Sequence, residues 1–156
     1  MIFVDSSVIL NVLFRTELTD YALEAIASDE PKITSETVID EVYFVALKRK
    51  LVEGKVLSAA AVRRILQRKE SARRTAVEIL ARVVGSIRAM GIVVVSDSKT
   101  EDLAPYVEKY GLMPHDAKIL ATAISAGADK LAVLDTDFRN VEELELVPVS
   151  FWKGKV

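Results

Sequence analysis

Two acidic residues in this sequence directly follow short apolar runs. Asp5 comes after Ile2-Phe3-Val4, and Asp135 comes after Leu131–Leu134. Such runs predict buried strands, and ligands of α/β proteins bind beyond the carboxyl ends of their strands. Both carboxylates therefore stand where a site can be built, although an Asp after a strand also serves as an ordinary cap or turn residue.

A third acid, Glu41, lies on the edge of an apolar helix face. The spacing of apolar residues predicts a helix over Glu36–Lys50, in which Val38 and Phe44 are neighbours of Glu41. A carboxylate in that position costs desolvation energy unless it is paired or binds a cation. The alternatives are an ion pair with a Lys or Arg, a side chain that simply reaches water, and Asp40 as the functional acid instead.

A fourth acid, Asp116, repeats this pattern in the predicted helix Pro114–Ala126. It lies in the first turn, and Ile119, Leu120 and Ala123 share its face, so its side chain is directed toward the sheet. An acid in the first turn also stabilises the helix dipole, by about 0.3–1 kcal/mol. The dipole explains an acid at this end of the helix but not its place on the apolar face.

Four carboxylates that converge on one cleft repel each other. A like-charged pair about 4 Å apart costs about 4 kcal/mol at an effective dielectric constant of about 20, and a divalent cation removes that cost. The chain has no Cys and a single His, so the donor set is all oxygen, which suits Mg²⁺ or Mn²⁺ rather than Zn²⁺. Carboxylate-held cations of this kind serve phosphate chemistry. Because such a site needs no imidazole base, we interpret His115 as an exposed residue at a helix start.

The elements that must position these acids can also be predicted. Apolar, non-alternating strands separated by helices indicate an α/β fold with a parallel sheet covered on both faces. We expect Ser6 or Ser7 to cap the first helix, Thr34 or Ser35 to cap the helix of Glu41, and Asp97 to be a turn or cap residue. The expected strands are Ile2–Val4, Lys32–Thr34, Ile92–Val95, Leu131–Leu134 and Leu146–Val149. The expected helices begin near Val8, Leu18, Glu36, Ser58, Ala72, Thr100 and Pro114.

Charge is divided unevenly along the chain. The net charge is −2, but residues 48–88 carry +9 and the remaining residues carry −11. The basic clusters predict an RNA-backbone track that leads to the acids, a solvated helix face, or a contact with an acidic partner. No aromatic residue is interleaved with them, so they do not predict base stacking. The clusters are Arg63-Arg64, Arg68-Lys69 and Arg73-Arg74.

Length and composition exclude several classes of protein. The 156 residues are 51% hydrophobic and 28% charged, which excludes a disordered chain and predicts a single domain over residues 1–156. The lack of Cys excludes a disulfide framework. No apolar stretch is long enough for a membrane span, and the start of the chain lacks the basic region of a signal peptide, so we expect a cytoplasmic protein. We interpret Phe151 and Trp152 as terminal packing residues or a dimer contact.

Four segments, in order along nearly the whole chain, resemble the PIN-domain nucleases and, within them, the small VapC-type toxin ribonucleases. The segments are Ile2–Leu10 with the first acid, Val38–Val42 with the second, Pro114–Ala123 with the third, and Leu131–Phe138 with its D-x-D-F ending. The resemblance implies a three-layer α/β/α sandwich with a mainly parallel central sheet. It also implies a Mg²⁺- or Mn²⁺-dependent endoribonuclease that uses a metal-activated water, forms a homodimer and is blocked by a small antitoxin protein.

The resemblance further implies roles for individual residues. The implied catalytic residues are Asp5, Glu41, Asp116 and Asp135. Of these, Asp5, Asp116 and Asp135 would hold metal, and Glu41 would hold metal or orient the water. Ser6 would support the first acid or a phosphate, and Asp137 would hold a second metal or a turn.

Other functions are weighed against the nuclease. Val133 and Leu134 are apolar where the family commonly has a Ser or Thr and a polar residue, which favours a PIN-like scaffold that binds RNA or protein without cutting. A haloacid-dehalogenase-type phosphatase needs an Asp at the position of Ser7. A phospho-receiver needs an acidic pair beside its acceptor Asp and a late Lys after a strand, an order that Asp135 and Asp137 do not supply.

Overall fold

The structure is a computed structural model that describes residues 1–51 and 58–155, and within these residues five parallel strands form one sheet. The strand order is β3-β2-β1-β4-β5. Central β1 is buried along its length, and its Phe3 pairs with Ile33 of β2 on one side and Leu131 of β4 on the other. The strands are β1 (Ile2–Val4), β2 (Lys32–Ser35), β3 (Ile92–Val95), β4 (Lys130–Ala132) and β5 (Glu145–Val147).

The predicted α/β fold is confirmed, and three strand ends are corrected. β2 ends at Ser35 rather than Thr34, because Ser35 still pairs with Val95 of β3. β4 ends at Ala132 rather than Leu134, because Leu134 N–H donates to a side chain instead of a neighbouring strand. β5 ends at Val147 rather than Val149, because Pro148 has no N–H to donate to a ladder and begins a short helix. β3 has the predicted bounds, but as an edge strand it exposes Val93 and Val94.

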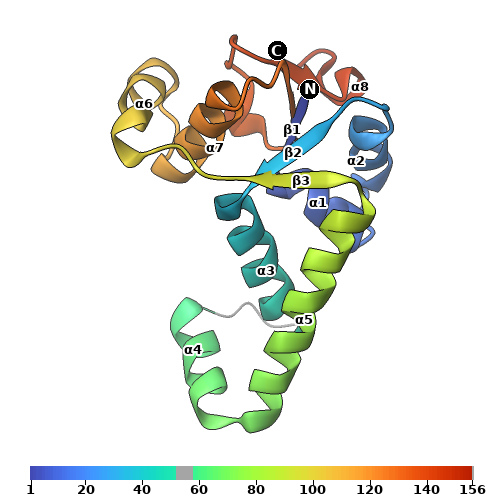
Figure 1. Cartoon of the computed structure of the whole chain (residues 1–156), viewed down its shortest axis with the longest axis vertical. Coiled ribbons are helices and arrows are strands. Elements are labelled where there is room, and N and C mark those ends of the chain that lie inside the picture. The colour runs from blue at the N-terminus through green and yellow to red at the C-terminus, as the bar shows by residue number, and fades with distance from the viewer. Residues whose placement is uncertain (52–57, 156) are drawn as a thin grey trace.

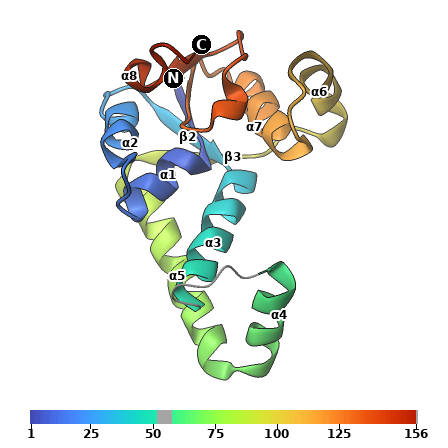
Figure 2. The same ribbon diagram turned by 180° about the vertical axis from the view of Figure 1, so that it is seen from behind.

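Helices cover both faces of the sheet. Figures 1 and 2 show α1 and α2 on one side and α6 and α7 on the other. This arrangement follows from right-handed crossovers, because the chain moves outward from β1 to β3 and then returns past β1 to β4. The helices are α1 (Ser6–Leu13), α2 (Thr19–Ile26), α3 (Glu36–Leu51), α4 (Ala59–Arg68), α5 (Glu70–Ala89), α6 (Ala104–Tyr110), α7 (Pro114–Ser125) and α8 (Val149–Trp152), with 3₁₀ turns η1 (Thr100–Leu103) and η2 (Thr136–Phe138).

One part of the helical layer extends away from the sheet. We call α4 and α5 the helical arm; α5 packs beside α3, and α4 folds back along α5 at the far end (Figure 1). Lys69 lies between the two helices in an extended conformation. In α4 only Val62 is fully buried, Ile65 and Leu66 are partly buried, and the charged residues of the helix are exposed.

The C-terminal residues complete the core. Trp152 is buried and donates its indole N–H to Val133 O over 3.2 Å, and its ring meets Phe151 edge-on. These two aromatic residues are therefore packing residues of this chain. In the described part of the chain, no helix combines the length and apolar character that crossing a membrane requires.

Candidate active site

Asp5 directly follows β1 at the switch point of the sheet, where the strand order reverses. The chain leaves β1 toward β2 on one side, while β4 lies on the other side, and a crevice opens at such a switch point. Asp5 N–H still donates to Ala132 O of β4 over 2.9 Å, so the backbone continues the sheet while the side chain begins a helix. Its carboxylate accepts from Ser7 N–H over 2.9 Å, so Asp5 itself caps α1 and neither Ser6 nor Ser7 does.

The hydroxyl that supports Asp5 belongs to Ser7. Ser7 Oγ donates to Asp5 Oδ2 over 2.6 Å and accepts from Leu134 N–H over 2.9 Å, which ties the end of β1 to the segment after β4. Ser6 is buried beside them but makes no side-chain hydrogen bond to Asp5 in the described residues. The sequence could not separate these two serines, because the difference depends on where the β4 segment passes.

Burial makes the Asp5 carboxylate unusually basic. Only 3% of the residue is exposed, and this desolvation raises the pKa of Asp5 from 3.8 to about 6. The Ser7 hydrogen bonds lower the pKa again in part, and the negative charge of Glu41 raises it further. Asp5 and Glu41 are thus close enough to repel each other, as expected for two acids of one site.

Glu41 comes to the site from α3 and meets His115 of α7. Glu41 Oε2 lies 2.9 Å from His115 Nε2, and the two side chains are 37% and 42% exposed. His115 is thus exposed at a helix start, as predicted, but its contact with Glu41 was missed. The only signal available in the sequence was that His115 precedes Asp116.

Asp116 is half-buried at the start of α7, on the side that faces the other acids. Its pKa is raised, first by burial and then by the charges of Asp135, Asp137 and Glu41, while His115 opposes the shift. Asp135 and Asp137 are exposed, and Asp135 caps η2 by accepting from Asp137 N–H over 2.9 Å. The structure therefore brings Asp116 near Asp135, Asp137 and Glu41, and brings Glu41 near Asp5. Asp135 also fills the turn role considered for it.

Asp97, predicted to be a turn or cap residue, positions α3. Asp97 follows β3 and accepts from Thr37 N–H and from Thr37 Oγ1, the latter over 2.9 Å, so it caps α3 from the neighbouring strand. The predicted caps do not do this: Thr34 Oγ1 donates to Val4 O, and buried Ser35 Oγ has no hydrogen-bond partner in the described residues. Asp97 thereby sets the start of the helix that carries Glu41.

The chemistry of this donor set suits a hard divalent cation. The pKa values of Asp5 and Asp116 are raised first by burial and then by the negative charge of neighbouring acids, Glu41 among them, and a bound cation removes this cost. Over residues 1–51 and 58–155, no three Asp, Glu or His side chains stand close enough to form a preassembled metal cage. The charge and oxygen donors fit Mg²⁺ or Mn²⁺, and the structure fixes Asp5 more firmly than the exposed Asp135.

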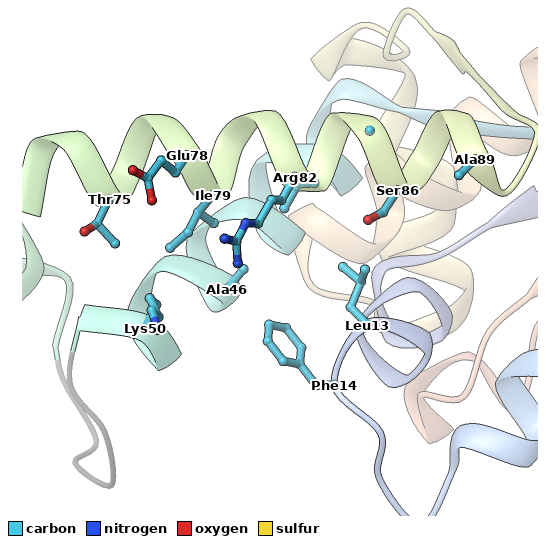
Figure 3. Close-up of a pocket in the computed structure, with 12 residues that line it drawn as sticks. Leu13, Phe14, Ala46, Lys50, Thr75, Glu78, Ile79, Arg82, Ser86 and Ala89 are labelled. Atoms are coloured by element: carbon cyan, nitrogen blue, oxygen red, sulfur yellow. The ribbon is translucent and has the colours of Figure 1, made fainter.

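A second hollow of the described surface lies away from these acids. A groove of about 640 Å³ runs between α1, α3 and α5, with apolar walls and charged rims (Figure 3). Its walls include Leu13, Phe14 and Ile79, and its rims include Lys50, Glu78 and Arg82. None of the predicted acids lines it, so the groove is separate from the acidic edge of the sheet.

The predicted RNA-binding arginines lie on the helical arm, all of them exposed. Arg74 pairs with Glu70 over 2.5 Å, and Arg73 donates to the last carbonyls of α4, so these two also stabilise the arm. Arg64 and Arg68 line a shallow hollow with Lys69 and make no ion pair within the described residues. The five arginines predicted to bind RNA therefore fall into two groups. Arg63, Arg64 and Arg68 are available to a ligand, whereas Arg73 and Arg74 have structural partners.

Comparison with known proteins agrees with this fold. The chain is 26% identical to Ribonuclease VapC6 of Methanocaldococcus jannaschii over 94% of this chain and 95% of that protein. Its fold is similar to Mycobacterium tuberculosis VapC20, a sarcin–ricin loop cleaving toxin, with a TM-score of 0.56, 18% identity, and coverage of 88% and 92% of the two chains.

A chain of a toxin–antitoxin complex from Klebsiella pneumoniae is similar to the same degree, with a TM-score of 0.56, 19% identity, and coverage of 95% of this chain and 97% of that one. The PIN domain family matches residues 2–144, a span that contains all the acids described above. The chain therefore belongs to the PIN domain family and is a distant homologue of the VapC toxin ribonucleases.

Proposed function

We propose that this protein is a Mg²⁺- or Mn²⁺-dependent endoribonuclease that hydrolyses RNA phosphodiester bonds and acts as the toxin of a type II toxin–antitoxin pair. The observation that carries the proposal is the buried carboxylate of Asp5 at the switch point of the sheet, with Glu41 near enough to raise its pKa. Burying an ionisable carboxylate costs folding free energy, and groups whose pKa values are strongly shifted by burial cluster at functional sites.

The residues have distinct tasks in this proposal. Asp5, Asp116 and Asp135 would hold the cation, which when bound activates a water and stabilises charge on the scissile phosphate. Ser7 holds the Asp5 carboxylate in place. Glu41 would hold the cation or orient the attacking water, and its hydrogen bond to His115 restrains the side chain for that purpose. Asp137 would hold a second cation or the turn, in which its backbone N–H donates to the Asp135 carboxylate.

The direct test is cleavage of labelled single-stranded and structured RNAs with Mn²⁺, with Mg²⁺ and with EDTA. We expect the native protein to cut only with a cation and Asp5→Asn to cut under no condition, while circular dichroism shows both folded. Asp29→Asn, an exposed acid between α2 and β2, is the matched control and should cut like the native protein. Cation-dependent cleavage by Asp5→Asn would refute the proposal.

A second candidate is a scaffold that binds RNA or protein without cutting. Val133 and Leu134 are buried and are used for packing and for hydrogen bonds to Val147, Trp152 and Ser7, so they offer no polar side chain to the site. Calorimetric titration with Mn²⁺ separates the two functions. A nuclease binds the ion, and binding weakens in Asp5→Asn, whereas a scaffold has no need of it.

Three partners accompany the proposed activity: RNA, a small antitoxin and a second copy of the chain. The antitoxin is suggested by structural neighbours solved as toxin–antitoxin complexes. The groove in Figure 3 has the apolar walls and charged rims that an amphipathic antitoxin segment would need. Exposed Val77 and Leu80 of α5 offer apolar surface for a homodimer.

A further inference from the structure

A shallow pocket adjoins the acids on the side of α3 and α7. We call it the aromatic pocket; it has a volume of about 420 Å³ and is lined by Thr37, Asp40, Glu41, Phe44 and His115. Glu41 belongs both to this pocket and to the acidic site, so a ligand in the pocket lies next to the proposed cleavage centre. The volume is large enough for a single nucleobase.

Phe44 gives the pocket an exposed aromatic surface. It follows Glu41 by three residues on α3, which puts the two side chains on the same helix face, and 37% of Phe44 is exposed. Covering a water-exposed aromatic ring with a flat ligand removes apolar surface from water, which makes binding of that ligand more favourable. In nucleic-acid-binding proteins, bases stack on such rings in a way that tolerates any base.

His115 also lines the pocket. It comes from α7, and its hydrogen bond to Glu41 over 2.9 Å restrains the imidazole there. The pocket is therefore bounded by two rings from two different helices. A base that is paired and stacked within a duplex cannot reach such walls, so the geometry favours an unpaired base.

The charges select the base of a nucleotide rather than its phosphate. Asp40 and Glu41 line the pocket and repel anions, while their oxygens accept from the amino and imino groups of a base edge. Lys48 Nζ lies over one face of the Phe44 ring, 5.4 Å from the ring centroid. A base that stacks on this face displaces the flexible ammonium group, which then supplies a cation for the attached phosphate. Guanine fits this pattern well, because its edge presents adjacent imino and amino donors to one carboxylate.

We propose that the aromatic pocket binds one unpaired nucleobase next to the cleaved bond, with Phe44 as its stacking surface and Asp40 as the acceptor that favours guanine. The inference rests on the proposed ribonuclease function, since it assigns a subsite to the same RNA. In this proposal, residues of α3 and α7 recognise the base, and the helical arm binds the RNA backbone.

The experiment is an abasic scan of binding. A fluorescein-labelled eight-nucleotide RNA and a series with one abasic site at each position are titrated by anisotropy against Asp5→Asn protein, which does not need to cut. The same series is titrated against Asp5→Asn combined with Phe44→Ala, with Phe44→Trp, or with Leu23→Ala. Leu23 is an exposed apolar residue of α2 and serves as the matched control.

We expect one abasic position to weaken binding about tenfold in the Asp5→Asn protein, as stacking interactions do. That effect should vanish with Phe44→Ala and persist with Phe44→Trp and Leu23→Ala. Replacing guanine by other bases at that position should weaken binding, and Asp40→Asn should reduce the difference. If the abasic effects are the same with and without Phe44→Ala, the pocket does not bind a base.

The two proposals fail in different ways. RNA cleavage without any coupling between Phe44 and an abasic position would overturn the aromatic pocket and leave the ribonuclease standing. Coupling in the binding assay together with no cation-dependent cleavage would overturn the ribonuclease and support the pocket. Absence of RNA binding would overturn both.

Discussion

The acidic edge of the sheet buries a charged side chain, whereas the helical arm exposes its charged side chains to water. At the edge, Asp5 is buried, which raises the pKa of its carboxyl group, and Ser7 holds that group by a hydrogen bond. On the arm, the arginines stay in water, and α4 buries only Val62. The buried carboxylate is held in one position, whereas the exposed arginine side chains stay free to move and to exchange partners. We expect the edge to control the rate of cleavage and the arm to control affinity.

The comparison is tested most strongly by Asp116→Asn. Removing one carboxylate from the acidic edge should lower kcat by about 100-fold or more, because it removes stabilisation that a bound cation supplies to the transition state. Steady-state kinetics with Mn²⁺ measure this effect, and exposed Asp20→Asn on α2 is the control. An unchanged kcat would remove Asp116 from the site.

The cost of burying Asp5 is itself measurable. Because the pKa of Asp5 is about 6 in the folded protein and near 3.8 when unfolded, the folded state binds more protons between about pH 4 and pH 6. Stability therefore falls as pH rises through that window, by about 3 kcal/mol for a shift of this size.

We expect Asp5→Asn to be more stable than the native protein at pH 7.5 without metal, with the difference disappearing below pH 4. Urea denaturation at both pH values measures it. Added Mn²⁺ should stabilise the native protein and not the variant. Equal pH dependence in the two proteins would show that Asp5 is not desolvated.

The link between the two central strands is tested by Ser7→Ala. The change leaves Leu134 N–H without its partner and removes the hydroxyl from Asp5, so the free energy of unfolding should drop by about 1–3 kcal/mol. Ser6→Ala is the neighbouring control and should have the smaller effect. Thermal denaturation of both variants distinguishes them, and the reverse order would assign the supporting role to Ser6.

The smallest effect is expected on the arm. Replacing Arg64 and Arg68 by Gln should raise KM a few-fold and leave kcat unchanged, because the change weakens binding of the RNA backbone only. The dependence of log Kd on log salt should become shallower by about 0.7 for each phosphate that is no longer neutralised. Arg88→Gln, an exposed arginine near β3, is the control. An unchanged KM and salt slope would identify this face of the arm as merely solvated.

Much of this protein follows from local patterns. A short apolar run is enough to predict β1, since burial on both faces leaves no room for polar alternation. Asp5 was found because a charge at the end of such a run is conspicuous, and Asp116 because it shares a face with core residues. The resemblance to PIN-domain nucleases predicts that these acids belong to one site, and in the structure Glu41 lies close enough to raise the pKa of both.

What the sequence determined alone is therefore the parallel α/β fold, the helices and the identity of the acids, because these depend on periodicity and residue type. Only the tertiary structure decided which serine holds Asp5, that Asp97 caps α3, and that His115 meets Glu41. Each of these interactions depends on how elements distant in sequence pass one another, and a hydrogen bond depends on tenths of an ångström that no spacing rule contains. The same reason explains why the arginines, predicted as one set, separate into structural and available groups once the arm folds back on itself.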